Sequence, residues 1–521
     1  MKTKRILFVL SSCIIVMMMV LNSSCKQSRV SVGTTPDAVY EKLVSNPSLN
    51  KPSTGETFCW RARSGMNQFV DYFQLTNDTK WLEAGIKYYD FLLGRREVDP
   101  EGYKGWIGPY MYDAKYWQDA LVGDAVVLAG ILDFSVLVME NEQLKAKYGE
   151  KAMSYVETAK KDLVEKWDKR GCWYTDPPFG GYINYNKYFM PGNIKEWVYD
   201  PDVRNAGVSH PFNKQMDVAE VCLRIHKITG EKKYWDIAET IYFTAKNRFQ
   251  YFDDHYCWNY WEPLYPGDVI FEKNNTRHWV GVHIWRSGYQ AGEVGKIVEA
   301  YHHGIVFDSV DIQRIINTNL NVMWNKNKER PEFINSNGFG ADHDTTGKAS
   351  FVAGNGHSNE FKNQGQLWSG LLDFNQTIRG LYEMRFRDDK TSPEYLSYKR
   401  QVLANPTSFE RKFAKESVNV PEINYTECRD LYSAAVLPHI VPRAGESILI
   451  CKSWNPGDLQ IDLFSTDGNK ITSLFNGNIK EGFFMIKWDG KDPAKKATFK
   501  GDYKIRWTIN GGYREFPVVI N

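Results

Sequence analysis

Apolar residues recur with the period of an α-helix through most of the chain. Residues at positions i, i+3, i+4 and i+7 share one face of a helix, so a run with this spacing predicts a helix that buries that face. Such runs cover residues 120–139, 156–167, 215–228, 289–301, 312–324 and 367–384. The pattern therefore predicts a mainly α fold.

A helix–turn–helix pattern repeats within this region. Residues 75–92 and 228–245 each place a polar turn, LTNDTKW or ITGEKKYW, between two apolar-periodic helices, and residues 147–152 form a weaker third copy. Successive helical pairs are typical of repeat architectures. The turns resemble the helical hairpins of (α/α) toroids, found in six-hairpin glycosidases and toroid-type polysaccharide lyases. Long aromatic loops between the pairs favour a closed toroid over residues 56–430, and an open helical solenoid is the alternative.

The pattern changes to that of β-strands near residue 434. Runs at 447–451, 459–464, 483–488 and 503–507 predict strands, and Asp467-Gly468 and Asp489-Gly490 supply turns. The sequence WDGKD at 488–492, followed by Gly501-Asp502-Tyr503, resembles the signature of the Ig-like module named for flagellar hook-capping proteins. This resemblance implies an Ig-like β-sandwich over residues 434–521. We expect it to be dispensable for chemistry, because acid–base residues are not concentrated there.

Residues 1–25 have the composition of an export signal. Basic residues precede an apolar run from 6 to 21, and small residues lead to Cys25. This segment resembles a bacterial lipobox, although Asn22 stands where an aliphatic residue is usual. It implies a lipoprotein exported to the cell envelope, in the outer membrane or periplasm, with residues 26–55 as a polar tether. Secretion with cleavage nearby is the alternative, and we expect no other apolar stretch to cross a bilayer.

Composition narrows the functional classes. The 65 Lys and Arg residues nearly balance the 63 Asp and Glu residues, so the net charge of +2 gives no bulk attraction for nucleic acid. Aromatic residues make up 14% of the chain, and those in polar loops suit stacking on sugar rings. The cysteines beyond Cys25 are scattered without a CxxC pair, which argues against a zinc cage and leaves one or two disulfides open.

The candidate site follows from the toroid. The N-termini of its inner helices gather at one mouth, where helix dipoles favour bound anions, so the loops before those helices hold the candidate residues. The expected catalytic residues are His210, Asn213, His283, Arg286 and Tyr289. The expected substrate-binding residues are Tyr185, Trp258, Tyr260, Trp261, Glu262, His278, Asn337 and Trp368.

Two reactions compete for this site. Elimination at a uronate needs a base for the C5 proton and a group that neutralises the carboxylate. Arg286 suits the carboxylate, Tyr289 or His283 suits the proton, and toroid lyases use these residue types. A glycosidase needs two carboxyl groups across the bond. Glu262 is its best candidate acid, but no partner is identifiable. We therefore expect a polysaccharide lyase, with a glycoside hydrolase or a non-catalytic glycan-binding lipoprotein as alternatives.

No cofactor is expected. Metal-binding pairs of the HExxH or HxH type do not occur on a predicted helix. Asp342 and Asp344 flank His343 in one loop, where a structural cation is the alternative to local backbone hydrogen bonds. The expected partners are an acidic polysaccharide or oligosaccharide and, through the lipid anchor, a membrane.

Overall fold

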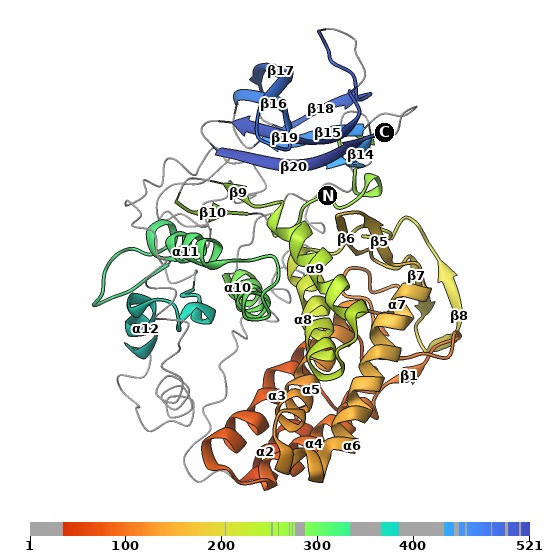
Figure 1. Ribbon diagram of the computed structural model, residues 1–521. Coiled ribbons are helices and arrows are strands. Elements are labelled where there is room, and N and C mark those ends of the chain that lie inside the picture. The colour runs from red at the N-terminus through yellow and green to blue at the C-terminus, as the bar shows by residue number, and fades with distance from the viewer. Residues whose placement is uncertain are drawn as a thin grey trace, which may run out of the picture.

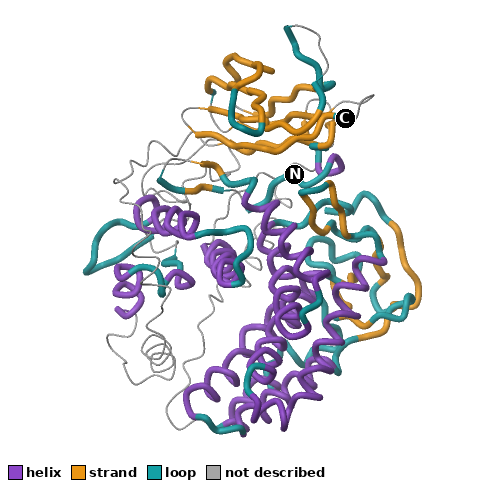
Figure 2. Tube along the Cα trace, viewed as in Figure 1, coloured by secondary structure: helices purple, strands orange, loops and turns teal. Residues whose placement is uncertain are grey.

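The computed structural model divides into a helical region and a β-sandwich (Figures 1 and 2). It describes residues 35–521 apart from 204, 252–253, 259, 270, 273–274, 277–286, 334–365, 385–431, 442–446, 454–455, 481, 495–498 and 510–511.

Helical hairpins form the larger part. The hairpins are α3 (Glu56–Thr76) with α4 (Lys80–Leu93), α5 (Leu121–Met139) with α6 (Glu142–Ala159), α8 (Phe212–Thr229) with α9 (Lys232–Lys246), and α10 (Ser287–His302) with α11 (Ser309–Asn317). The first helix of each hairpin packs on the first helix of the next, so α3, α5, α8 and α10 form an inner row. Asn77 and Gly230, the residues that follow α3 and α8, take the left-handed conformation, with φ of 58° and 74°. The predicted succession of hairpins is confirmed, whereas closure into a toroid stays a prediction.

Shorter helices complete the helical region. They are α2 (Pro36–Val44), the π-helix η1 (Lys160–Glu165) with α7 (Lys166–Lys169), η2 (Pro266–Asp268), the π-helix η3 (Thr318–Met323), η4 (Ser369–Leu371) and α12 (Gln376–Glu383).

Helix α5 is the centre of the helical core. Its 19 residues have the length and composition of a membrane span, so the expectation that no other apolar stretch is long enough to cross a bilayer was wrong. However, 83% of its most apolar 18-residue stretch is buried inside the protein, because α5 packs against α3, α6 and α8. Its hydropathy is therefore that of a core helix enclosed by other helices.

Short strands interrupt the helical region before α5 and α8. One sheet has the order β3 (Ile107–Pro109), β4 (Trp117–Asp119), β7 (Lys187–Met190) and β8 (Asn193–Tyr199). Separate pairs are β1 (Glu97–Val98) with β2 (Lys104–Gly105), β5 (Trp173–Asp176) with β6 (Phe179–Tyr182), and β11 (Phe271–Glu272) with β12 (Asn275–Thr276). Gln118 of β4 and the loop residues Tyr110 and Tyr185 line the pocket described below.

The C-terminal part is a two-sheet sandwich. One sheet contains β13 (Tyr432–Leu437), β15 (Ser447–Ser453) and β18 (Gly482–Trp488), and the facing sheet contains β16 (Gly457–Ser465), β17 (Lys470–Ile479), β19 (Gly501–Ile509) and β20 (Gly512–Ile520). Inward residues of both sheets, such as Leu449 and Trp507, share one core. The four predicted strands are β15, β16, β18 and β19, and the β-sandwich is confirmed.

The larger sheet continues into the helical region. Strand β9 (Gln250–Tyr251) pairs with β20 through Tyr251 and Tyr513, and β10 (Tyr256–Cys257) pairs with β9. Strand β14 (Ile440–Val441) runs parallel to the other end of β20. The two parts of the chain therefore share a hydrogen-bonded sheet.

Four thiols lie in the cores of the two parts. Cys59, Cys172 and Cys222 belong to the helical core and Cys451 to the sandwich core, and all four are free and buried. Burial raises the pKa of the Cys172 thiol to about 12, so it is protonated at neutral pH.

Candidate functional site

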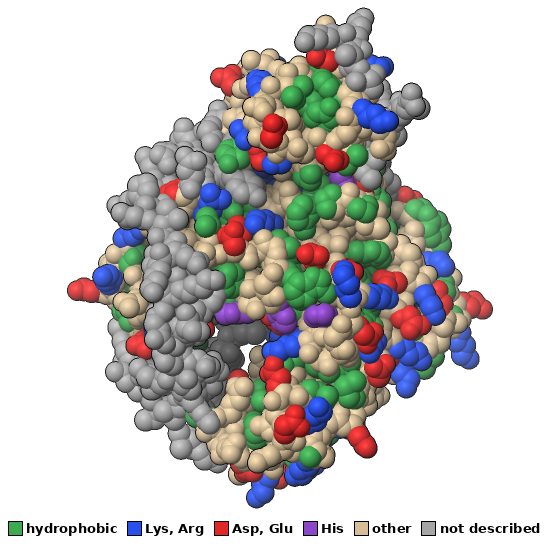
Figure 3. All heavy atoms as spheres, viewed as in Figure 1, with side chains coloured by type: hydrophobic (Ala, Val, Ile, Leu, Met, Phe, Trp, Pro, Cys, Tyr) green, Lys and Arg blue, Asp and Glu red, His purple; other side chains and the backbone are tan. Residues whose placement is uncertain are grey.

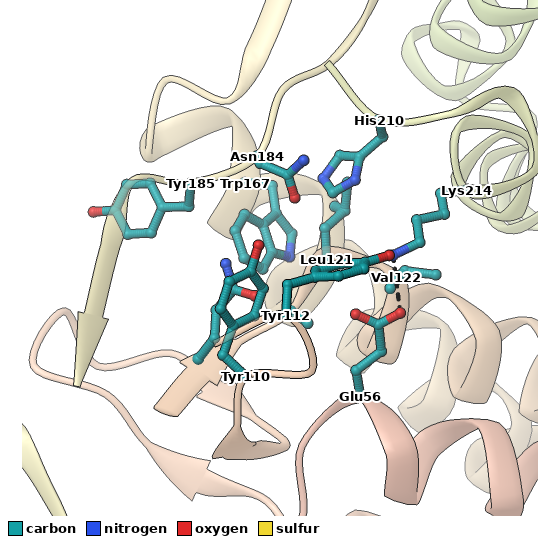
Figure 4. Close-up of a pocket in the computed structure, with 12 residues that line it drawn as sticks. Glu56, Tyr110, Tyr112, Leu121, Val122, Trp167, Asn184, Tyr185, His210 and Lys214 are labelled. Atoms are coloured by element: carbon teal, nitrogen blue, oxygen red, sulfur yellow. Dashed lines mark hydrogen bonds and ion pairs between the residues drawn. The ribbon is translucent and has the colours of Figure 1, made fainter. Parts of the chain in front are cut away.

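A narrow pocket lies where the N-termini of three inner helices meet (Figure 4). Glu56 begins α3, Leu121 and Val122 begin α5, and Lys214 lies in the first turn of α8. The volume of this pocket is about 10 Å³, which is room for about one water molecule. The expected gathering of inner-helix N-termini is thus confirmed for α3, α5 and α8. The other lining residues are Tyr110, Tyr112, Gln118, Ala120, Trp167, Asn184, Tyr185 and His210.

The segment that carries His210 is fixed by β6 and by the start of α8. The backbone N–H of His210 donates to the carbonyl of Tyr182 at 3.0 Å. The Gln215 side chain accepts from the Tyr182 N–H at 2.8 Å and donates to the Tyr182 carbonyl at 2.7 Å. Pro211 then caps α8 in an extended conformation, which suits proline before a first helical turn. His210 is therefore held at the helix entrance, as the sequence indicated.

His210 combines burial with an open nitrogen. Only 6% of its surface is exposed, and within the described residues its Nδ1 has no hydrogen-bond partner. Burial, reinforced by the charge of Lys214, lowers the pKa of His210 well below 6.5. The imidazole is therefore neutral at neutral pH and can accept a proton.

Lys214 and Glu56 form a buried ion pair. Lys214 Nζ lies 2.9 Å from Glu56 Oε1, which also accepts from Trp60 Nε1 at 3.2 Å. Burial would lower the pKa of Lys214, but the Glu56 carboxylate outweighs it and raises that pKa above its ordinary value. Lys214 thus keeps its charge although a cation in the first turn opposes the helix dipole.

Tyrosines from two segments lie close to Lys214. Its Nζ is 5.7 Å from the centre of the Tyr112 ring, and Tyr112 and Tyr289 both act electrostatically on it. Tyr289, in the first turn of α10, is 45% exposed, and its ring centre is 5.7 Å from that of Tyr260. The N-terminal turn of α10 therefore adds an accessible phenol close to the same charged group.

A buried charge network supports the pocket wall at the start of α5. Lys166 Nζ pairs with Asp119 at 2.9 Å and with Asp124 at 2.7 Å. Asp124 also accepts from Trp167 Nε1 at 3.0 Å. Ala120, the N-cap of α5, supplies no side-chain acceptor to the first turn of this helix, and Leu121 and Val122 of that turn line the pocket.

A second cavity, of about 350 Å³, lies toward the opposite ends of α5, α8 and α10. Arg224 on its wall pairs with Glu220 at 2.6 Å, with Asp133 at 3.0 Å and with Glu299 at 3.2 Å. The charge of Arg224 is therefore compensated within the cavity wall.

On the face in Figure 3, basic and acidic side chains of the described part are interspersed.

The structure brings some of the predicted site residues together. His210 and Tyr185 line the pocket, and Tyr260 and Tyr289 lie beside it. Asn213 is 3% exposed in the first turn of α8, and its Oδ1 has no hydrogen-bond partner in the described part of the chain.

The predicted aromatic platforms lie deeper in the fold. Trp258 is 1% exposed, stacks on Phe249 with 4.7 Å between ring centres and donates to Glu293 Oε2 at 2.8 Å. Trp368 is fully buried beside it, with 5.4 Å between the ring centres. Packing against these neighbours explains why their faces are covered in this structure.

Trp261 and Glu262 lie between the pocket and the sandwich. Trp261 Nε1 donates to Ser209 Oγ at 3.4 Å, and Glu262 accepts from Arg514 of β20 at 2.7 Å. The remaining predicted residues, His278, His283, Arg286, Asn337, Asp342, Asp344 and Cys25, lie outside the described residues. Among those that are described, no group of three His, Cys, Asp or Glu side chains is arranged to hold a metal ion.

Glu56 and Lys214 were not among the residues predicted for the site. Lys214 follows His210 by four residues at the start of a predicted helix, and this unfavourable place for a cation was an available signal. Glu56 shows no such signal, since its partner is 158 positions away.

No protein-family model and no curated protein matches the chain. Among solved structures, a GH127 β-L-arabinofuranosidase from Geobacillus stearothermophilus T6 is similar at 10% identity and a TM-score of 0.25, over 90% of this chain and 68% of that one. A likeness at this level carries no argument about fold or activity.

Proposed function

We propose that the protein is a carbohydrate-active enzyme that cleaves a uronate-containing glycan by β-elimination. The observation that carries this proposal is the buried His210, with an open Nδ1, beside the Lys214 cation where helix N-termini converge. A neutral base next to a fixed positive charge suits removal of a proton adjacent to a carboxylate. As part of the same proposal, the chain is an exported lipoprotein anchored through Cys25.

Carboxylate binding, proton abstraction and protonation of the leaving group are each assigned to a group at this site. Lys214 and the first N–H groups of α5 receive the uronate carboxylate and stabilise the charge that develops on it. His210 Nδ1 accepts the C5 proton, and the electron pair left on C5 forms the C4–C5 double bond. The C4–O4 bond breaks, and the hydroxyl of Tyr289 gives its proton to the leaving oxygen.

The number of carboxyl groups that line the pocket favours elimination over hydrolysis. A typical glycosidase needs two of them across the scissile bond. Among the described lining residues Glu56 is the only carboxylate, and it is paired with Lys214. A hydrolase would have to use a second carboxylate from elsewhere in the chain.

The test is a panel of uronate-containing and neutral polysaccharides, read by ultraviolet absorbance of the unsaturated product and by new reducing ends. Absorbance that rises with reducing ends, and that is lost in His210→Gln, is the expected result. The matched control is His226→Gln, since His226 lies in the last turn of α8, at the end away from His210, and its Nδ1 is 3.1 Å from the Glu231 carbonyl oxygen. Reducing ends without absorbance would select the hydrolase, and binding without either product would select the glycan-binding protein.

A further inference from the structure

We infer that the C-terminal β-sandwich holds the candidate site in shape through Arg514 and Glu262, which act as positioning residues. The inference rests on the proposed function only in treating His210 as the base. It replaces the expectation that residues 434–521 are dispensable for chemistry.

The first link joins the sandwich to residues 260–268. Arg514 on β20 and Glu262 are both fully buried, and Arg514 Nη2 donates to Glu262 Oε1 at 2.7 Å. Arg514 Nη1 donates to the Ala434 carbonyl of β13 at 3.1 Å. Water cannot replace either partner of a buried ion pair. The Arg514 guanidinium therefore holds the Glu262 carboxylate and the Ala434 carbonyl in fixed positions.

The second link joins residues 260–268 to the segment that carries His210. The Phe212 N–H donates to the Tyr260 carbonyl at 2.9 Å, and the Ser209 N–H donates to Asp268 Oδ1 at 2.7 Å. Trp261 adds its contact to Ser209. His210 is thus flanked on both sides by residues bonded to the segment that Arg514 holds.

Arg248 adds a third contact from the helical region. It lies between the Phe179 and Phe516 rings, 4.9 Å and 4.8 Å from their centres, and donates to the Pro263 carbonyl at 3.3 Å. Phe516 belongs to β20. The same segment is therefore bound to two arginines: Arg514 belongs to the sandwich, and Arg248 contacts it through Phe516.

A matched control lies one register position away. Arg506 faces Glu515, and Trp507 faces Arg514, along β19 and β20. The Arg506–Glu515 pair is 2.5 Å long, and its side chains are 37% and 30% exposed. Because side chains alternate across a sheet, this pair lies on the face away from Glu262.

The experiment is an NMR titration of the His210 imidazole in the full-length protein, with its signal assigned through His210→Gln. Arg514→Met and Glu262→Gln are compared with Arg506→Met. Loosening of residues 260–268 admits water around His210, and hydration favours the charged imidazole. We therefore expect the His210 pKa to rise toward 6.5 in both test variants, by less in Glu262→Gln, and to stay at its wild-type value in Arg506→Met.

A folded Arg514→Met protein with wild-type titration of His210 would overturn the inference. If Arg514→Met does not fold, Glu262→Gln decides alone, because its side chain keeps the size of glutamate and an acceptor for Arg514. On a substrate from the panel, the test variants should lower kcat more than they change KM. The titration needs no substrate, so a failed elimination assay and a failed positioning role give different results.

Discussion

A lysine in the first turn of a helix loses favourable interaction with the helix dipole, and a buried lysine also loses hydration. Lys214 bears both costs and is 7% exposed. Its ion pair with Glu56 offsets them, and it keeps a positive charge beside His210. Such a costly arrangement is typical of functional sites, where stability is given up for chemistry.

Removal of Lys214 should therefore destabilise the fold as well as abolish activity. We expect Lys214→Met to lower the free energy of unfolding by about 3–5 kcal/mol, since Glu56 is left buried and unpaired. The double variant Lys214→Met with Glu56→Gln should recover most of this loss without regaining turnover. Urea unfolding measures the stabilities, and turnover is assayed on the substrate that the panel identifies.

The exposed pair Lys227–Glu140, with side chains 40% and 56% exposed, provides the control. Lys227→Met should cost no more than about 1 kcal/mol. Equal losses from the two lysines would contradict the role given to burial.

The phenol of Tyr289 gives a separate prediction. Tyr289→Phe should reduce turnover by about 10²–10⁴-fold, which is typical of the loss of a proton-transfer group. Because the side chain is 45% exposed, the urea midpoint should stay near the wild-type value. The comparison is Tyr40→Phe, a change far along the chain in α2, which should leave turnover unchanged. Full activity in Tyr289→Phe would remove it from the proposed reaction.

At the scale of elements, α8 and α10 present charged residues to each other along their inner faces. Lys296 Nζ lies 2.5 Å from Asp217, and Glu293 accepts from Trp258. Burial, with a smaller contribution from Asp217, raises the pKa of Glu293 to about 8. The protonated form of Glu293 is therefore favoured in the folded protein at neutral pH.

This raised pKa makes the stability depend on pH. The contribution of protonated Glu293 is fully present below its ordinary pKa of 4.5 and is lost as the pH rises through about 8. Each pH unit in this window removes up to about 1.4 kcal/mol. Glu293→Gln, which keeps an acceptor for Trp258, should gain stability relative to wild type as the pH rises.

Urea unfolding of both proteins between about pH 5 and pH 8 measures this change. Glu157→Gln is the control, because the Glu157 side chain is 62% exposed. A constant stability difference between Glu293→Gln and wild type across this range would contradict the assignment.

Elements with long periodic patterns were predictable from the sequence. The runs at 120–139 and 215–228 became α5 and α8 within a few residues, because a repeated apolar face specifies a helix locally. Strands β3 and β4 have three residues each, which is too short for a period-two pattern. The pairing of Tyr251 with Tyr513 depends on packing between distant parts of the chain, which no local pattern contains.

The candidate site was predictable to the same degree. His210 precedes a proline at a helix start, and this local signal placed it correctly. The partner of Lys214 and the burial of Trp258 depend on how the hairpins assemble, so no local pattern predicts them. The same limit applies to Glu262, whose carboxylate meets an arginine 252 positions away.

At the scale of the whole molecule, the sandwich and the helical region share buried contacts as well as a sheet. Phe179 of β6 belongs to the same core as Phe516 and Val518 of β20. His439 Nδ1 lies 2.8 Å from Asp176 of β5. The boundary between the two parts is therefore a packed interface.

A chain that ends at residue 430 should be less stable than the full-length protein. Glu262 and Arg248 would lose Arg514 and Phe516, and an uncompensated buried charge costs about 3–5 kcal/mol. The urea midpoint and the tryptophan fluorescence of the truncated chain measure the loss. A fragment with the wild-type midpoint and full turnover would instead support a dispensable sandwich.

Export and anchoring form a further prediction for the whole molecule. If Cys25 carries a lipid, the wild-type protein should partition into membranes and need detergent for release, since an acyl chain supplies about 0.8 kcal/mol per buried CH₂. Cys25→Ser should be recovered in the aqueous fraction, and Cys13→Ser should behave as wild type. Membrane partition of Cys25→Ser would contradict the anchor.

The four buried thiols make the cooperativity of unfolding measurable. A thiol reagent reaches Cys59, Cys172 and Cys222 only when the helical core opens, and it reaches Cys451 only when the sandwich opens. In dilute urea, mass spectrometry of the labelled peptides would follow each site separately. Equal labelling rates at all four positions would mean that the two parts open together, and earlier labelling of Cys451 would mean that the sandwich opens first.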